Sequence, residues 1–131
     1  MRVLFALAPL AFAAACAGSG PAVDGITPAG VDKIVDMTAT LNFAPNAVTI
    51  NSGDTVEFRN ISTFTHTVST VADTQIEAQA VKLPNGADPF DSGEIAPGAT
   101  FTHTFTTPGT YQYFCEPHVG QGMIGTVIVN P

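Results

Sequence analysis

Residues 100–115 read TFTHTFTTPGTYQYFC, and they carry the clearest structural signal in the chain. Phe101 and Phe105 alternate with threonine, which is typical of a strand that is buried on one face. A Pro-Gly turn signal follows, and an aromatic run then ends at Cys115. We expect two strands here, joined as a hairpin whose loop is longer than the tightest kind.

Similar short runs rich in β-branched residues, separated by turn signals, fill much of the remaining chain. In the best of them Val56 and Phe58 face one way and charged residues the other. Residues 72–94 show no clear pattern, and residues 75–83 are compatible with a helical turn, a strand or a loop. Further strands are expected at 35–41, 47–50, 54–59, 65–71 and 126–129. The pattern predicts an all-β domain, a two-sheet sandwich of seven to eight strands.

Composition limits the domain count and the class of partner. A chain of 131 residues, with 45% hydrophobic and 11% charged residues, has room for one globular domain. The formal net charge is −7, and the four basic residues are scattered rather than clustered. Nucleic acid is therefore not an expected partner, because phosphate binding needs a concentrated positive surface.

The N-terminal segment has the pattern of an export signal. Residues 1–17 combine a positive start, a short apolar stretch and small residues before a cleavage point, so they are expected to be a signal peptide. Cleavage after Ala17 would give a soluble product, whereas cleavage before Cys16 would leave a lipid anchor, and both remain open. Residues 18–33 are expected to be a flexible linker and residues 34–131 the folded domain, in a periplasmic or otherwise extracytoplasmic location.

One cysteine of the exported domain has no partner in sequence. Because thiols oxidise outside the cytoplasm, an exported cysteine is expected to be paired or held by something else. Cys115 begins the pattern C-x2-H-x4-M, with His118 and Met123 following it. A thiolate, an imidazole and a thioether form a soft ligand set that favours copper over calcium or magnesium.

A second imidazole would complete a copper site with a weak axial sulfur. His66 lies 49 residues before Cys115, near the end of another strand, and a sandwich would bring the two ends together. His103 is the rival ligand. Alternation places it mid-strand on the face of Phe101 and Phe105, where a partly buried or edge position is expected instead.

These residues resemble a known family. Residues 43–129 are similar to the plastocyanin-type blue copper proteins, members of the cupredoxins, with GTYQYFCEPH at 109–118 and GMIG at 122–125 as the specific motifs. The resemblance implies a Greek-key sandwich in which His66, Cys115 and His118 are equatorial ligands of one copper ion and Met123 is the axial ligand. It also places Phe64 and Pro117 near the site. The chain has Thr67 where the family often has an asparagine that ties two copper loops together.

Two classes of function follow from this ligand set. The leading hypothesis is a monomeric one-electron carrier, not an enzyme, whose copper ion cycles between Cu(I) and Cu(II) and exchanges electrons with a cytochrome or a copper oxidase or reductase. The alternative is a copper-binding protein for supply or scavenging without a redox role. Residues 72–95 contain five acidic residues and one lysine. We expect a solvated loop of an acidic protein here, and the alternative is a charged surface that steers a basic partner.

Overall fold

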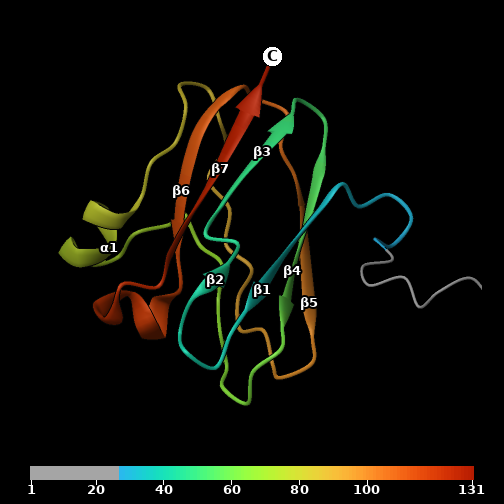
Figure 1. Cartoon of the computed structure of the whole chain (residues 1–131). Helices are drawn as coiled ribbons and strands as arrows, with labels where there is room; N and C mark the ends of the chain where they lie inside the picture. Colours follow the sequence, from blue (N-terminus) through green and yellow to red (C-terminus); the bar gives the residue numbers. More distant parts are fainter. Residues whose placement is uncertain (1–26) are drawn as a thin grey trace, which may run out of the picture.

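The computed structural model describes residues 27–131 as a β-sandwich with two short helices (Figure 1). The signal peptide expected at 1–17, with Cys16, and most of the expected linker lie outside the described residues. In the part of the chain that is described, no helix is long and apolar enough to span a membrane. The strands are β1 (Lys33–Met37), β2 (Phe43–Ala44), β3 (Ala47–Asn51), β4 (Thr55–Asn60), β5 (Thr100–Thr104), β6 (Gly109–Phe114) and β7 (Ile124–Asn130).

The seven strands form two mixed sheets, so the predicted all-β sandwich is confirmed. One sheet has the order β2-β1-β4-β5 and the other the order β3-β7-β6. The pairs β1–β4 and β3–β7 are parallel, and the remaining pairs are antiparallel. Because consecutive strands often lie in different sheets, loops that leave one sheet meet loops that leave the other.

The core lies between the sheets and is centred on aromatic rings. Tyr113 of β6 is fully buried, and its ring packs edge-on against Phe43 at 4.8 Å and against Phe58 at 5.2 Å between centroids. Edge-to-face pairs of this kind add stability beyond the area they bury. Alternation in β4 correctly predicts that Val56 and Phe58 are buried together.

The predicted hairpin over residues 100–115 is wrong. Both strands form, but β5 pairs with β4 in one sheet and β6 with β7 in the other. The chain stays attached to the first sheet through Phe105, whose N–H donates to the carbonyl of Asp54. It then turns a corner that is fixed by a hydrogen bond from Tyr111 Oη to the Thr107 carbonyl at 2.7 Å.

Residues 65–71, predicted as a strand, form only isolated bridges. His66 bridges Ile95, and Ser69 bridges both Asp91 and Phe114. The segment is buried from His66 to Thr70, but its partners belong to separate pieces of chain rather than to one continuous strand. It therefore lies between the end of β6, at Phe114, and the segment that contains Asp91 and Ile95, without forming a continuous strand of either sheet.

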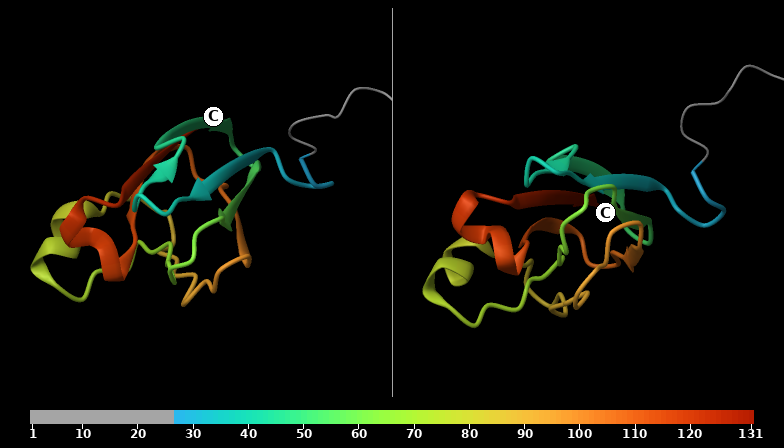
Figure 2. Two further views of the ribbon diagram at one scale, coloured as in Figure 1. Left: turned by 60° about the horizontal axis from the view of Figure 1, so that its bottom comes forward. Right: turned by 90° about the horizontal axis from the view of Figure 1, so that it is seen from below.

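The segment left open at 75–83 contains the α-helix α1 (Gln75–Ala80). The side chain of Thr74 accepts from the Glu77 N–H, and the Glu77 carboxylate accepts from the Thr74 N–H, which makes a capping box. A 3-10 helix, η1 (Glu116–Gln121), lies beside α1 on the side of the sandwich away from the residues that precede β1 (Figures 1 and 2).

We predict that Gly125→Ala destabilises the fold because β7 passes directly over the Tyr113 ring. An added Cβ at Gly125 would overlap the Cζ and Oη atoms of that ring. The expected loss in the free energy of unfolding is about 3 kcal/mol, the upper end of the usual range for overpacking. Gly120→Ala is the matched control, since its Cβ would meet no atom within 4 Å. Equal urea midpoints for the two variants would contradict this packing.

Candidate metal centre

Two loops, one from each sheet, bring the candidate ligands together. His66 lies in the segment that follows β4, and Cys115 directly follows β6. His118 lies on η1, which begins immediately after Cys115. The metal-binding atoms of these three residues all lie within 4.8 Å of one another.

The two histidines turn the same ring nitrogen toward the cysteine. Cys115 Sγ lies 3.6 Å from His66 Nδ1 and 3.4 Å from His118 Nδ1. The two imidazole centroids are 5.0 Å apart. One sulfur and two imidazole nitrogens that converge on one point match the soft donor set that copper prefers, so these residues fit a copper ion.

Backbone hydrogen bonds close the loop that carries three of the four expected ligands. The N–H of Cys115 donates to the carbonyl of Met123 at 3.1 Å, and the N–H of His118 donates to the carbonyl of Cys115 at 3.1 Å. Gly122 ends η1 with φ of 81°, in the left-handed region that glycine adopts most readily. Met123 is thereby fixed at the base of the loop, and it is fully buried.

Thr67 ties the two loops together in place of the asparagine that is common in the family. Its N–H donates to Cys115 Sγ at 3.3 Å, and its hydroxyl accepts from the N–H of Glu116 at 2.8 Å. Both Thr67 and Cys115 are buried. The threonine therefore supplies the loop-to-loop hydrogen bond that the sequence alone left in doubt.

Burial makes the site favour neutral ligands until a cation binds. It raises the pKa of the Cys115 thiol, and the hydrogen bonds from Thr67 only partly oppose this. The pKa of His66 is lowered, first by burial and then by repulsion from His118, while a hydrogen bond with the Thr38 backbone acts in the other direction. A bound copper ion would favour the thiolate and the neutral imidazoles, which are the forms that ligate.

His118 lies at the boundary between the site and solvent. It is partly exposed, and its ring packs edge-on against Phe64 at 6.3 Å between centroids. Phe64 itself is 47% exposed, and Ile61 in the same loop is 61% exposed. Pro117 is also exposed on η1. The resemblance places Phe64 near the site, and its contact with the His118 ring agrees with that expectation.

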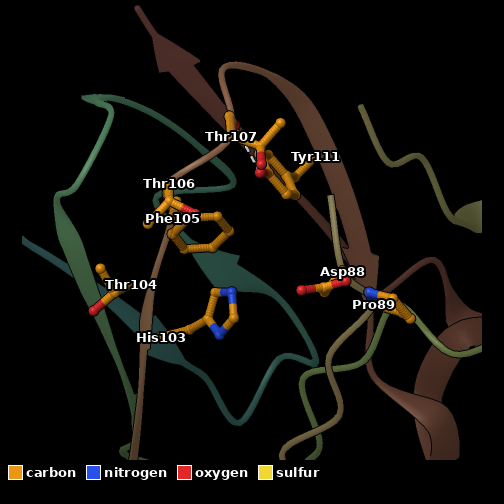
Figure 3. Close-up of a pocket in the computed structure, with 8 residues that line it drawn as sticks. All are labelled: Asp88, Pro89, His103, Thr104, Phe105, Thr106, Thr107 and Tyr111. Atoms are coloured by element: carbon orange, nitrogen blue, oxygen red, sulfur yellow. Dashed lines mark hydrogen bonds between the residues drawn. The ribbon is translucent and has the colours of Figure 1, made fainter. Parts of the chain in front are cut away.

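His103 lies elsewhere, in the position that alternation predicts. It is partly buried on the edge strand β5, and its ring stacks on Phe90 with centroids 4.0 Å apart. It lines a small pocket with Asp88 and Tyr111 among others, none of which belongs to the metal cluster (Figure 3). His66, rather than His103, is the imidazole that the fold brings to Cys115.

Residues 29–130 match the sequence profile described as copper binding proteins of the plastocyanin/azurin family. The chain belongs to this family. The resemblance inferred from the two motifs around Cys115 and Met123 is therefore confirmed.

Plastocyanins are among the relatives of this chain. It is 42% identical to chloroplastic plastocyanin from Oryza sativa over 94 residues, which are 69% of this chain and 56% of that protein. It is 38% identical to plastocyanin from Scenedesmus fuscus over 102 residues, 75% of this chain and 96% of that protein. The chain thus spans just over half the length of the rice and barley relatives.

Solved cupredoxin structures share the fold. The Cu(I) form of an amicyanin mutant superposes with a TM-score of 0.61 at 27% identity, covering 80% of this chain and 87% of that one. A purple cupredoxin from Nitrosopumilus maritimus has a TM-score of 0.60 at 22% identity, covering 76% of this chain and all of that one.

We predict that Thr67→Val weakens the link between the two loops. The variant keeps the side-chain volume but leaves the partly buried N–H of Glu116 without its acceptor, and we expect a loss of about 1 kcal/mol, the lower end of the range for an unsatisfied donor. Thr67→Ser keeps the hydroxyl and should retain most of the stability. Urea unfolding of the metal-free proteins measures the stability of both variants. Equal stability of the valine and serine variants would show that the Thr67 hydroxyl does not link the two loops.

We predict a pH-dependent contribution from His103. Burial lowers its pKa in the folded protein below 6.5, so the unfolded chain takes up the proton first as the pH falls. The stabilisation by neutral His103 is therefore complete above about pH 6.5 and declines below it. In urea unfolding, the stability difference between wild type and His103→Gln should shrink as the pH is lowered. A difference that grows instead would contradict the assigned shift.

Proposed function

We propose that this protein is a one-electron carrier with a mononuclear type 1 copper site held by His66, Cys115, His118 and Met123. The observation that carries the proposal is the convergence of two Nδ1 atoms on the buried Cys115 sulfur. Copper would supply the redox couple, Cu(I) and Cu(II). The chain would supply the ligands and the route by which electrons enter and leave. Family membership supports this reading.

Met123 would complete the ligand set as a weaker thioether donor. It is fully buried, and its backbone is hydrogen-bonded to both Cys115 and His118, so it belongs to the same closed loop as these two residues. A weak axial thioether beside a thiolate and two imidazoles is the donor combination of blue-copper electron-transfer sites. Four protein ligands would leave no open coordination position for a substrate. We therefore propose a carrier rather than an enzyme.

Rigidity of the ligands favours electron transfer over copper supply. His66 and Cys115 are fully buried. Ser62 hydrogen-bonds to His66 within the loop after β4, and the N–H of Thr67 in that loop donates to the Cys115 sulfur in the other loop. Donors that are already in place change little between the two oxidation states of the ion, which keeps the cost of reorganisation low. A supply or scavenging protein would instead need ligands that open readily for exchange.

Electrons would enter and leave through His118. Its ring is the partly exposed member of the cluster, and the apolar side chains of Phe64 and Ile61 lie exposed on the neighbouring loop. An apolar rim allows a redox partner to approach closely without stripping water from charged groups.

The partner that we propose is a redox protein with a basic surface, such as a cytochrome or a copper oxidase or reductase. Burial raises the pKa of Glu116, and so do the nearby carboxylates of Asp91, Glu77 and Asp73. These acidic groups therefore lie close to η1 and to the metal site. A concentration of negative charge close to the metal site would speed the encounter with a positively charged partner.

We further propose that the carrier is exported and acts outside the cytoplasm as a monomer. Cys115 is the free cysteine of the described residues, and ligation of copper would protect its thiol in an oxidising compartment. In this proposal residues 1–17 direct export, and residues 18–33 link this signal to the cupredoxin domain of residues 34–131, although Lys33 already pairs in β1. A lipid anchor at Cys16 would tether the domain to a membrane.

We predict that Cys115→Ser abolishes the intense visible absorption of the copper-loaded protein, because that absorption requires the thiolate. Met123→Leu should keep the colour and raise the reduction potential, since loss of the thioether disfavours Cu(II). Optical spectra and redox titration measure the two effects. A serine variant that stayed blue would exclude Cys115 as the ligand, and a colourless, redox-silent wild type would favour copper supply instead.

A further inference from the structure

We propose that the side chain of Ser62 positions His66 and sets its tautomer, so that Nδ1 is free to bind a metal. The inference rests on the proposed copper site but concerns a residue that is not a ligand. Ser62 is buried, lies four residues before His66, and places Oγ 2.9 Å from His66 Nε2. This is the ring nitrogen that points away from Cys115.

The direction of that hydrogen bond follows from Asn60, whose amide orientation is fixed. Asn60 Nδ2 lies 2.7 Å from the Phe64 carbonyl and 2.9 Å from the Ile95 carbonyl, and both oxygens can only accept. The other end of the amide, Oδ1, accepts from the N–H of Ser62 at 3.0 Å. A flipped amide would place its oxygen, an acceptor, against both carbonyls and its NH2 group, a donor, against the N–H of Ser62.

The hydroxyl of Ser62 has one hydrogen, and it is committed to an acceptor. Ser62 Oγ lies 2.8 Å from Asn60 Oδ1 and 3.2 Å from the Phe64 carbonyl, neither of which carries a hydrogen. An oxygen–oxygen contact of 2.8 Å is attractive only with a hydrogen between the atoms. Ser62 Oγ also accepts from the Phe64 N–H at 3.1 Å. Toward His66 it is therefore an acceptor.

His66 must then carry its proton on Nε2. The neutral imidazole has one N–H, so Nδ1 is left with a lone pair directed at the point where Cys115 Sγ lies 3.6 Å away. Asn60, Ser62 and His66 thus form a chain that selects the ligating tautomer before any metal arrives. Such outer partners orient ligating histidines and raise their basicity.

Imidazole ¹⁵N chemical shifts of the metal-free protein test the assignment directly. We expect the His66 proton on Nε2 in wild type and a measurable population with the proton on Nδ1 in Ser62→Ala. The variant should also bind Cu(I) about 10-fold more weakly in a chelator competition, the loss usual for an outer partner of a metal ligand. Its reduction potential should rise, because a less basic imidazole stabilises Cu(II) less.

Ser69→Ala is the matched control. Ser69 is also fully buried and bonds within its own segment to Val71, so its loss should leave the His66 tautomer and the Cu(I) affinity unchanged. A wild-type proton on Nδ1 would overturn the proposal. A Ser62→Ala protein with the same His66 tautomer and the same Cu(I) affinity as Ser69→Ala would overturn it as well, since the hydrogen bond with the Thr38 backbone would then be enough to position His66. Wild type with the Nε2 proton but no copper uptake would overturn the proposed function and leave the tautomer assignment standing.

Discussion

The sulfur of Cys115 is held at the point where a loop from each sheet meets the other, and the remaining features of the site depend on this junction. The N–H of Thr67 donates to the sulfur, and the N–H of Glu116 donates to the hydroxyl of Thr67. Because β4 and β6 belong to different sheets, only a closed sandwich brings His66 to within 3.6 Å of a residue 49 positions away. The closed sandwich thus holds two imidazoles next to one buried thiol.

Polar residues next to the ligands fix details of the site that the sandwich alone does not determine. Thr67 fixes the distance between the loops, and Ser62 fixes the outer nitrogen of His66. Both side chains are buried among groups that would be costly to leave without partners, so they resist rearrangement. Within residues 27–131, the side of the metal site that faces solvent has no such buried polar support, because His118 and Phe64 are partly exposed there.

Local patterns predicted most of the strands and the candidate ligands, but not the isolated bridges formed by residues 65–71 or how distant segments pair. Alternation identified β4, β5 and β6, yet it could not show that β5 and β6 join different sheets, since this depends on a corner fixed by Tyr111 and Thr107. The capping box that starts α1, Thr74 followed by Glu77, was a signal within the sequence that could have identified the helix. Ser62 gave no such signal, because its role arises from the path of the loop around Asn60.

X-ray absorption at the copper edge tests the central claim most directly, since it counts the atoms bound to the metal in both oxidation states. The account predicts one short sulfur bond and two imidazole nitrogens per copper ion, with nearly the same shell in Cu(I) and Cu(II). A first shell without sulfur would contradict it. A shell that gained or lost an imidazole on reduction would contradict it as well, because the donors would then not be held in place by the fold.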